Sequence, residues 1–334
     1  MSDDPRNIDF LVRVEAAEDR DLARKKGIAT PAVTLPLPKS APIPPPSPAS
    51  EPLELNTYFA TLGPLAQGGF SHVWHARRRC DRKDVAIKVI KRPSSKDSVV
   101  VFQRELHALR VIARAGAYDH IVRLLANGVT PRRRTPALVL EMGRTSLRRH
   151  LSSSSARFPL TTVAEYMGQL VRAVRHLHVL SIVHRDLKPE NVLLIAPEKM
   201  LKKDTAASQT LKVCDFGLAR VLNAADQRLH TACGSPLYMA PELFRPPKAG
   251  YQGFPVDVWA LGTLAYELLH RRCAFAGYPA VRDLERAVRT GRHGPIDGRV
   301  SAVFRRLITR CLVVAPGERA TAAGLRLPVR RVGA

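Results

Sequence analysis

The stretch His184-Arg185-Asp186-Leu187-Lys188-Pro189-Glu190-Asn191 places a carboxylate, a cation and a metal-binding amide within eight residues. Asp186 can accept the proton of an attacking hydroxyl, Lys188 can neutralise a transferring phosphoryl group, and Asn191 can hold Mg²⁺. These are the candidate catalytic residues. An ordinary charged turn would explain His-Arg-Asp alone, but not all eight residues followed, 24 positions after Asn191, by Asp215-Phe216-Gly217.

Together these two segments resemble the protein kinase family, and Ala240-Pro241-Glu242 and Asp257-Val258-Trp259 extend the resemblance. It covers about residues 58–328 and implies an α+β fold of two lobes. The small β-rich N-lobe is expected over about 58–141 and the larger helical C-lobe over about 144–328. ATP and Mg²⁺ are the implied cofactors, with Asn191 and Asp215 as the metal ligands.

By the same resemblance, Asp257 is expected to cap the backbone of the 184–191 loop, and Glu242 is expected to pair with Arg319. Apolar residues recur at spacings of three and four over 163–177 and predict a long helix before this loop. Asp257 opens another, mostly apolar helix, and the chain after it fits three further helices.

Val85-Ala86-Ile87-Lys88 lies in a predicted strand over 84–90, and Glu105 follows Lys88 by seventeen residues in a predicted helix. By the resemblance, Lys88 holds the α and β phosphates of ATP and pairs with Glu105. A lysine in an otherwise apolar strand is costly unless it is partnered, which favours this pairing over two independent surface charges.

A glycine-rich loop that folds over ATP phosphates is expected between residues 65 and 73. This loop departs from the family pattern, because Ala66 and Ser71 stand where the first and third glycines are expected, which predicts weakened nucleotide affinity. The hinge between the lobes is expected at 141–143, with Leu140 as gatekeeper. Besides Lys88, Glu105 and Asp215, the residues that the resemblance assigns to nucleotide binding are Leu65, Ala66, Gly68, Gly69, Val73, Ala86, Glu141, Met142 and Leu193.

The regions outside the resemblance are expected to lack a packed fold. Residues 1–57 are predicted to be a disordered extension, and residues 31–52 contain nine prolines. That proline-rich linker is either a passive spacer or a site for a proline-motif-binding partner. A loop inserted at 197–210 is expected to be exposed, and residues 329–334 form a short tail.

The composition predicts a globular intracellular protein, cytoplasmic or nuclear. Apolar residues make up 45% of the chain, and the five cysteines lie far apart with no metal-binding spacing. No apolar run reaches the ~18 residues of a membrane span, and no signal-peptide pattern opens the chain. The formal charge is +24; because residues 1–57 carry 7 basic and 9 acidic side chains, the remainder carries +26. Its arginines are dispersed and aromatics make up only 6%, which argues against nucleic acid as a partner.

The substrates are expected to be serine or threonine hydroxyls of proteins, because Lys188 and Gly234-Ser235-Pro236-Leu237-Tyr238 resemble serine/threonine kinases. Ser235 is expected to position Asp186 and Lys188. Thr231 stands where related kinases carry an activating phosphate, added by the kinase itself or by an upstream kinase, and Arg185 and Arg220 are placed to bind that phosphate. Different segments resemble autophagy-initiating and calmodulin-dependent-like, NIMA-related and Numb-associated kinases, so the subgroup stays open.

Two alternatives belong to other functional classes. The altered glycine loop favours a kinase-fold scaffold with weak or no phosphotransfer, although such a scaffold has no physical need for the full set Lys88, Glu105, Asp186, Asn191 and Asp215. The basic charge permits a nucleic-acid-binding protein. Among acids that could select basic substrate residues, only Glu190 occupies a suitable position, so we expect no strict requirement for an upstream arginine.

Overall fold

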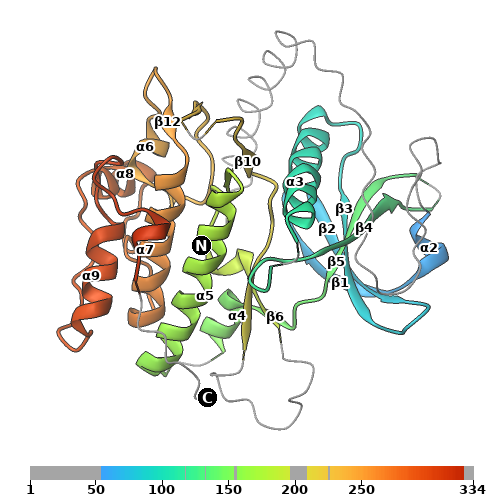
Figure 1. Ribbon diagram of the computed structural model, residues 1–334, viewed down its shortest axis with the longest axis horizontal. Helices are drawn as coiled ribbons and strands as arrows, with labels where there is room; N and C mark the ends of the chain where they lie inside the picture. The colour runs from blue at the N-terminus through green and yellow to red at the C-terminus, as the bar shows by residue number, and fades with distance from the viewer. Residues whose placement is uncertain are drawn as a thin grey trace. The chain divides into compact units, whose positions relative to one another are not determined.

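The computed structural model describes residues 54–116, 118–131, 133–153, 156–195, 209–224 and 226–326. The chain divides into two compact units: unit 1 is Met1–Ala117 with Val122–Gly143, and unit 2 is Tyr118–Ile121 with Arg144–Ala334 (Figure 1). The proline-rich linker, the tail at 329–334 and most of the insertion at 197–210 lie outside the described residues. Unit 1 is rich in β-structure and unit 2 is mainly helical, which confirms the expected α+β fold.

Unit 1 is an antiparallel five-stranded sheet in the order β1-β2-β3-β5-β4, with helix α3 packed against β3 and β4 (Figure 1). Helix α3 begins where Ser95 accepts a hydrogen bond from the amide of Ser98, a side-chain cap for otherwise unpaired N–H groups. The elements are β1 (Phe59–Gln67), β2 (Ser71–Arg78), β3 (Asp84–Ile90), α3 (Lys96–Arg114), β4 (Leu124–Val129) and β5 (Pro136–Glu141).

The strand register places the nucleotide-binding candidates on one face of this sheet. Val73 in β2 lies opposite Lys88 in β3, and Ala86 is two residues before Lys88, so all three side chains share a face. Val85 and Ile87 alternate with them and are buried in the hydrophobic core on the other face. The sheet therefore divides into a core face and a face that carries Lys88.

The packed chain begins before residue 58, where the sequence placed the boundary. Helix α2 (Leu55–Tyr58) precedes β1, and Leu55 is only 3% exposed within the core cluster of unit 1. The two leucines at 53 and 55, at the end of a proline-rich segment, are too few to show a periodic pattern, which explains why the expected boundary fell inside a packed segment.

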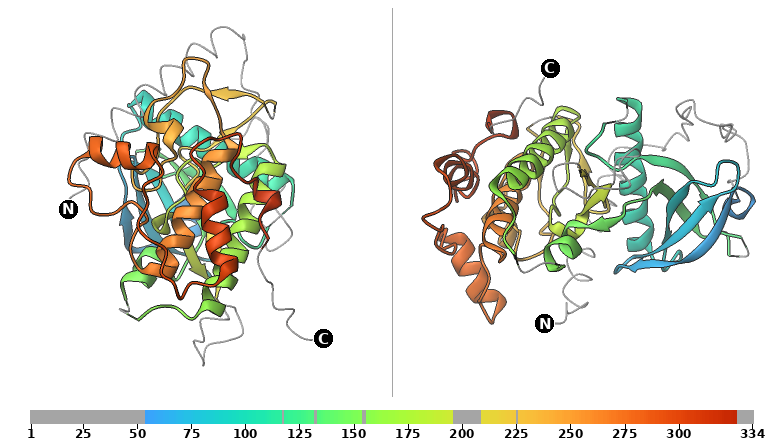
Figure 2. Two further views of the ribbon diagram at one scale, coloured as in Figure 1. Left: turned by 90° about the vertical axis from the view of Figure 1, so that its left-hand side faces the viewer. Right: turned by 90° about the horizontal axis from the view of Figure 1, so that it is seen from below.

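Unit 2 is built around long helices with short strands at one end. Helices α5, α7 and α9 pack in sequence, α5 on α7 and α7 on α9, and Figure 2 shows them side by side. The apolar spacing of three and four residues over 163–177 correctly predicted α5. The helices are α4 (Leu147–Ser152), α5 (Leu160–Val179), α6 (Pro241–Phe244), α7 (Phe254–His270), α8 (Val281–Arg289) and α9 (Ala302–Cys311).

The short strands of unit 2 form a three-stranded sheet β6-β8-β9 and two pairs, β7-β10 and β11-β12. They are β6 (Thr145–Ser146), β7 (Ile182–Val183), β8 (Val192–Ile195), β9 (Thr210–Val213), β10 (Arg220–Val221), β11 (Arg228–Leu229) and β12 (Tyr251–Gln252). The described residues also include the 3₁₀ turns η1 (Pro189–Asn191) and η3 (Ala322–Gly324). After α7 the described residues contain two α-helices and η3, where three helices were expected. No helix of the described chain combines the length and apolar character that crossing a membrane requires.

Helix α7 is buried on nearly all sides, and Gly262 allows α9 to approach it closely. A Cβ atom at Gly262 would lie 2.6 Å from Cys311 Cβ and 2.9 Å from Leu312 Cδ2. Cys311 Cβ is bonded directly to the backbone of α9 and cannot turn away, so an added methyl group would displace α9. The glycine is therefore required by packing.

We predict that Gly262→Ala lowers the free energy of unfolding by about 1–3 kcal/mol, the usual range for overpacking a core. Gly298→Ala is the matched control, because a Cβ there meets nothing within 4 Å. Urea denaturation followed by circular dichroism measures both variants. Equal stability of the two would show that α9 adjusts without cost.

Candidate active site

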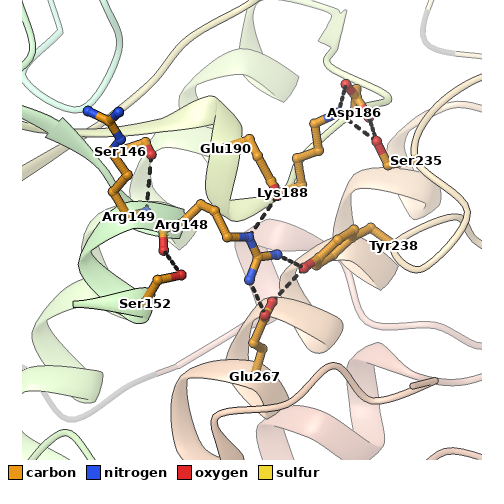
Figure 3. Close-up of polar contacts among 10 residues, drawn as sticks. All are labelled: Ser146, Arg148, Arg149, Ser152, Asp186, Lys188, Glu190, Ser235, Tyr238 and Glu267. Carbon is orange, nitrogen blue, oxygen red and sulfur yellow. Dashed lines mark hydrogen bonds and ion pairs between the residues drawn. The ribbon is translucent and has the colours of Figure 1, made fainter. Parts of the chain in front are cut away.

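Asp186, Lys188 and Ser235 form a closed set of hydrogen bonds in unit 2 (Figure 3). Ser235 Oγ donates to Asp186 Oδ1 at 2.9 Å and accepts from Lys188 Nζ at 2.6 Å, and Lys188 Nζ lies 3.1 Å from Asp186 Oδ2. The expectation that Ser235 positions both charged groups is confirmed at the level of these contacts. The set fixes the carboxylate beside a cation, which suits proton acceptance next to a negatively charged group.

The Lys188 ammonium remains charged in this environment. Burial alone would lower its pKa, but the carboxylates of Asp186, Asp215 and Glu190 outweigh burial, so the pKa is raised above its ordinary value. Lys188 therefore carries a fixed positive charge that can stabilise charge developing on a phosphoryl group.

Asn191 is oriented by Asp186. Its Nδ2 donates to the Asp186 carbonyl at 2.8 Å and to Asp186 Oδ2 at 3.0 Å. The Asn191 amide oxygen accepts no hydrogen bond from the described residues, so it is available to coordinate a metal ion. Together with the Asp215 carboxylate it fits Mg²⁺, which takes few protein oxygens and completes its shell with water and phosphate. The described residues contain no group of three or more His, Cys, Asp or Glu that could hold a metal by themselves.

A fully buried carboxylate holds the backbone of the 184–191 loop. Asp257 Oδ2 accepts from the His184 amide at 2.9 Å and Oδ1 accepts from the Arg185 amide at 2.8 Å, while His178 Nε2 lies 3.0 Å from Oδ2. Burial alone would raise the Asp257 pKa, but the hydrogen bond and charge of His178 and the contacts with His184 leave it lowered. The predicted role of Asp257 as a cap for this loop is confirmed.

His184 joins the loop to the segment that contains Asp215. Its Nδ1 accepts from the Asp186 amide at 3.3 Å, so Nε2 carries the hydrogen and donates to the Cys214 carbonyl at 3.0 Å. Its ring also contacts Phe216 edge-on, with centroids 5.1 Å apart. The position of Asp215 relative to Asp186 is therefore fixed through an imidazole.

The segment that carries Ser235 approaches the same loop at a glycine. Gly234 has φ +108°, and a Cβ there would lie 2.7 Å from the Arg185 carbonyl oxygen. Only glycine suits both the backbone conformation and the close contact.

In unit 1, Lys88 and Glu105 form the predicted pair. Lys88 Nζ lies 2.8 Å from Glu105 Oε1 and 2.7 Å from Oε2, and the two side chains are only 13% and 3% exposed. A buried carboxylate held this way keeps the lysine extended from the sheet face that also carries Val73 and Ala86.

The other nucleotide-binding candidates are distributed over both units. In unit 1 a hydrogen bond from the Gly68 amide to the Ser71 carbonyl (2.9 Å) closes the β1–β2 turn, and Leu65 is 40% exposed. The Glu141 amide donates to the Arg123 carbonyl at 3.1 Å, so this N–H is not available to an adenine ring. Leu65, Ala66, Gly68, Gly69, Val73, Ala86, Glu141 and Met142 belong to unit 1, whereas Leu193 belongs to β8 of unit 2.

Residues 59–326 match the protein kinase domain family. The chain belongs to the protein kinase family. It is 31% identical over 263 residues to CBL-interacting protein kinase 4 of Oryza sativa subsp. japonica, covering 78% of this chain and 54% of that protein. It is 35% identical over 230 residues to calcium/calmodulin-dependent protein kinase type 1B of Homo sapiens, covering 69% and 60%. The chain spans between 40% and 54% of the length of four CBL-interacting kinases that it matches.

The activation segment of this kinase ends in the predicted ion pair. Arg319 donates to Glu242 Oε1 at 2.8 Å and to Oε2 at 3.0 Å, with both side chains buried. Earlier in the segment, Thr231 is only 2% exposed, and its carbonyl accepts from Tyr251 Oη at 2.9 Å. Arg185 donates to the Leu218 carbonyl at 2.6 and 2.8 Å and to Tyr251 Oη at 3.3 Å.

Three residues of the kinase site were missed by the sequence reasoning: Arg148, Tyr238 and Glu267. Arg148 links Glu190, which was predicted to face the substrate, to Glu267 and Tyr238 (Figure 3). A usable signal was present for Glu267, because it is a charged residue within the apolar run of α7. Nothing local in the sequence marks Arg148 among the many arginines of this chain.

We predict that Asp257→Asn destabilises the kinase by about 1–3 kcal/mol at pH 7, because one of two backbone N–H groups loses its acceptor. A carboxylate with a lowered pKa contributes stability above its unfolded pKa and loses it as the pH falls through the folded pKa. The difference in the free energy of unfolding between wild type and Asp257→Asn should therefore become smaller below about pH 4. Urea titrations between pH 3 and 7 test this, with Asp283→Asn on α8 as control; a pH-independent difference would contradict it.

Proposed function

We propose that this chain is a serine/threonine protein kinase that transfers the γ-phosphate of ATP to serine and threonine hydroxyls of proteins. The observation that carries the proposal is the closed set of hydrogen bonds among Asp186, Lys188 and Ser235, with Asn191 bound to the same carboxylate. A structural turn needs no such set. Membership of the kinase family and similarity to serine/threonine kinases support the same activity.

Each residue has a distinct part in the proposed reaction. Asp186 accepts the proton of the substrate hydroxyl, and Ser235 keeps that carboxylate oriented. Lys188 stabilises negative charge on the transferred group, while Lys88, aligned by Glu105, holds the phosphates. Asn191 and Asp215 would hold Mg²⁺, which when bound supplies charge neutralisation between the phosphates.

Further parts of the proposal concern partners. Protein substrates are the primary partners. The similarity to a CBL-interacting protein kinase and to a calcium/calmodulin-dependent protein kinase suggests that a regulatory protein also binds. A partner that binds proline motifs is proposed for residues 31–52, which lie outside the described chain. Nucleic acid is not proposed as a partner.

The second candidate is a kinase-fold scaffold without phosphotransfer, favoured by Ala66 and Ser71 in the glycine-rich loop. A Cβ atom at Gly69 meets nothing within 4 Å, and one at Gly68 meets only ordinary contacts at 3.8 Å, so neither glycine is sterically required in this conformation. A protein that binds partners but transfers no phosphate from radiolabelled ATP would fit this candidate.

We predict that Asp186→Asn lowers phosphate transfer to a generic basic protein by about 10²- to 10⁴-fold, the usual effect of losing a general base. Lys88→Met and Asp215→Ala should also remove most activity, because positioning and charge neutralisation supply most of the rate. Radiolabelled ATP transfer measures all three.

Lys83→Met is the matched control for Lys88→Met, because Lys83 is exposed in the turn before β3. It should retain wild-type activity. Full activity of both Asp186→Asn and Lys88→Met would contradict the proposed mechanism.

We propose further that phosphorylation of Thr231 switches the kinase, through Arg185 and Arg220 as phosphate-binding cations. Because Thr231 is buried, the activation segment must open before another kinase can reach the hydroxyl. We predict that Thr231→Ala and phosphatase treatment both lower activity, whereas Thr309→Ala, at an exposed helix position, does not. Mass spectrometry locates the phosphate, and a fully active Thr231→Ala enzyme would contradict the switch.

A further inference from the structure

Arg148 is surrounded by acceptors in unit 2. Its Nε donates to Glu190 Oε1 at 2.7 Å, one terminal nitrogen donates to Glu267 Oε1 at 2.7 Å, and the other to Tyr238 Oη at 2.6 Å (Figure 3). Tyr238 Oη in turn donates to Glu267 Oε2 at 2.6 Å. The guanidinium thus uses all three of its nitrogens within one anionic pocket, formed by Glu190, Glu267 and Tyr238.

The pocket would carry two negative charges without Arg148. Glu267 has a side chain that is only 6% exposed, whereas Glu190 and Arg148 are 45% and 34% exposed. Burial opposes the charge on Arg148, but the two carboxylates outweigh burial and raise its pKa. The pocket is therefore partly open to solvent and suited to a guanidinium, whose planar set of N–H donors matches carboxylate acceptors.

The pocket also lies beside the proposed reaction centre. Glu190 is four residues after Asp186 in the same loop, and Tyr238 is three residues after Ser235, which donates to Asp186. A peptide whose hydroxyl reaches Asp186 must run close to these two elements. A side chain only a few residues from the acceptor can then approach Glu190.

We propose that Arg148 determines substrate specificity: its guanidinium fills the anionic pocket of Glu190, Glu267 and Tyr238 and so prevents the pocket from binding a basic side chain of the substrate. This inference rests on the proposed protein kinase activity. A substrate arginine would have to displace a group of the same chemistry that is already tethered beside the carboxylates, and the tether gives Arg148 a high effective concentration. The wild-type enzyme therefore gains nothing from a basic residue at that position.

The test removes the Arg148 guanidinium and measures whether the enzyme then prefers peptide substrates with an arginine near the acceptor serine. Peptides with one serine acceptor and a single arginine, moved through each flanking position, are compared with the alanine peptide. For Arg148→Ala, we expect kcat/KM for one arginine position to rise by about tenfold or more over the alanine peptide, with no such rise in wild type. Arg149→Ala is the matched control, because Arg149 is the exposed next residue of α4 and its loss changes the net charge equally.

A second substitution tests the pocket itself. In the Arg148→Ala background, Glu190→Gln should abolish the gained selection, and a gain that persists would overturn the assignment to this pocket. Arg148→Gln removes the charge while keeping a hydrogen-bond donor for Glu267, so it serves if Arg148→Ala does not fold. An active wild type whose arginine profile is unchanged in both Arg148 variants would overturn the proposal.

Binding distinguishes this proposal from the proposed activity. If wild type transfers no phosphate, the proposed function fails, but thermal shift with ethylguanidinium chloride still tests the pocket. We expect the melting temperature of Arg148→Ala to rise with ethylguanidinium relative to sodium chloride of equal strength, and wild type and Arg149→Ala to show no such rise. Equal responses of the three proteins would overturn the occupancy of the pocket by Arg148.

Discussion

The buried carboxylate of Asp257 is the constraint on which the catalytic loop depends. It accepts the amides of both His184 and Arg185, and Arg185 has φ +65°, a conformation that costs about 1–3 kcal/mol for a non-glycine residue. Hydrogen bonds to a charged acceptor contribute about 1.5–3 kcal/mol each, enough to offset that strain. Asp257 belongs to the first turn of the buried helix α7. The strained loop is therefore anchored directly to the packed core of unit 2.

The same strain fixes where the reactive groups lie. With Arg185 in this conformation, its carbonyl approaches Gly234 so closely that no side chain fits there, and Ser235 is brought to Asp186. The His184 ring, held in the same loop, donates to the Cys214 carbonyl and so positions that residue as well. Asp215, which also has positive φ (+62°), follows directly. The positions of the candidate catalytic groups therefore depend on one connected set of contacts between side chains and backbone, not on each side chain independently.

The sequence predicted the parts of this arrangement whose partners belong to recognisable motifs, including Lys88 with Glu105 and Glu242 with Arg319. It also predicted α5 from spacing and β3 from an apolar run. It could not predict the contacts of Arg148, whose three partners lie 42, 90 and 119 residues away and share no motif with it. Long-range contacts of a common residue type leave no local periodicity or composition signal.

The high positive charge of the chain explains why Arg148 cannot be recognised from the sequence. With +26 over residues 58–334, arginines are so frequent that one inside an anionic pocket looks no different from one on the surface. The global field repels basic peptides only within a Debye length of roughly 8 Å and weakens with salt. Arg148 acts at hydrogen-bond distance, where screening is small, and it neutralises the buried Glu267 that would otherwise carry an unpaired charge. One residue thus stabilises unit 2 and excludes basic side chains from the pocket, so selectivity set there should persist at salt concentrations that suppress the global field.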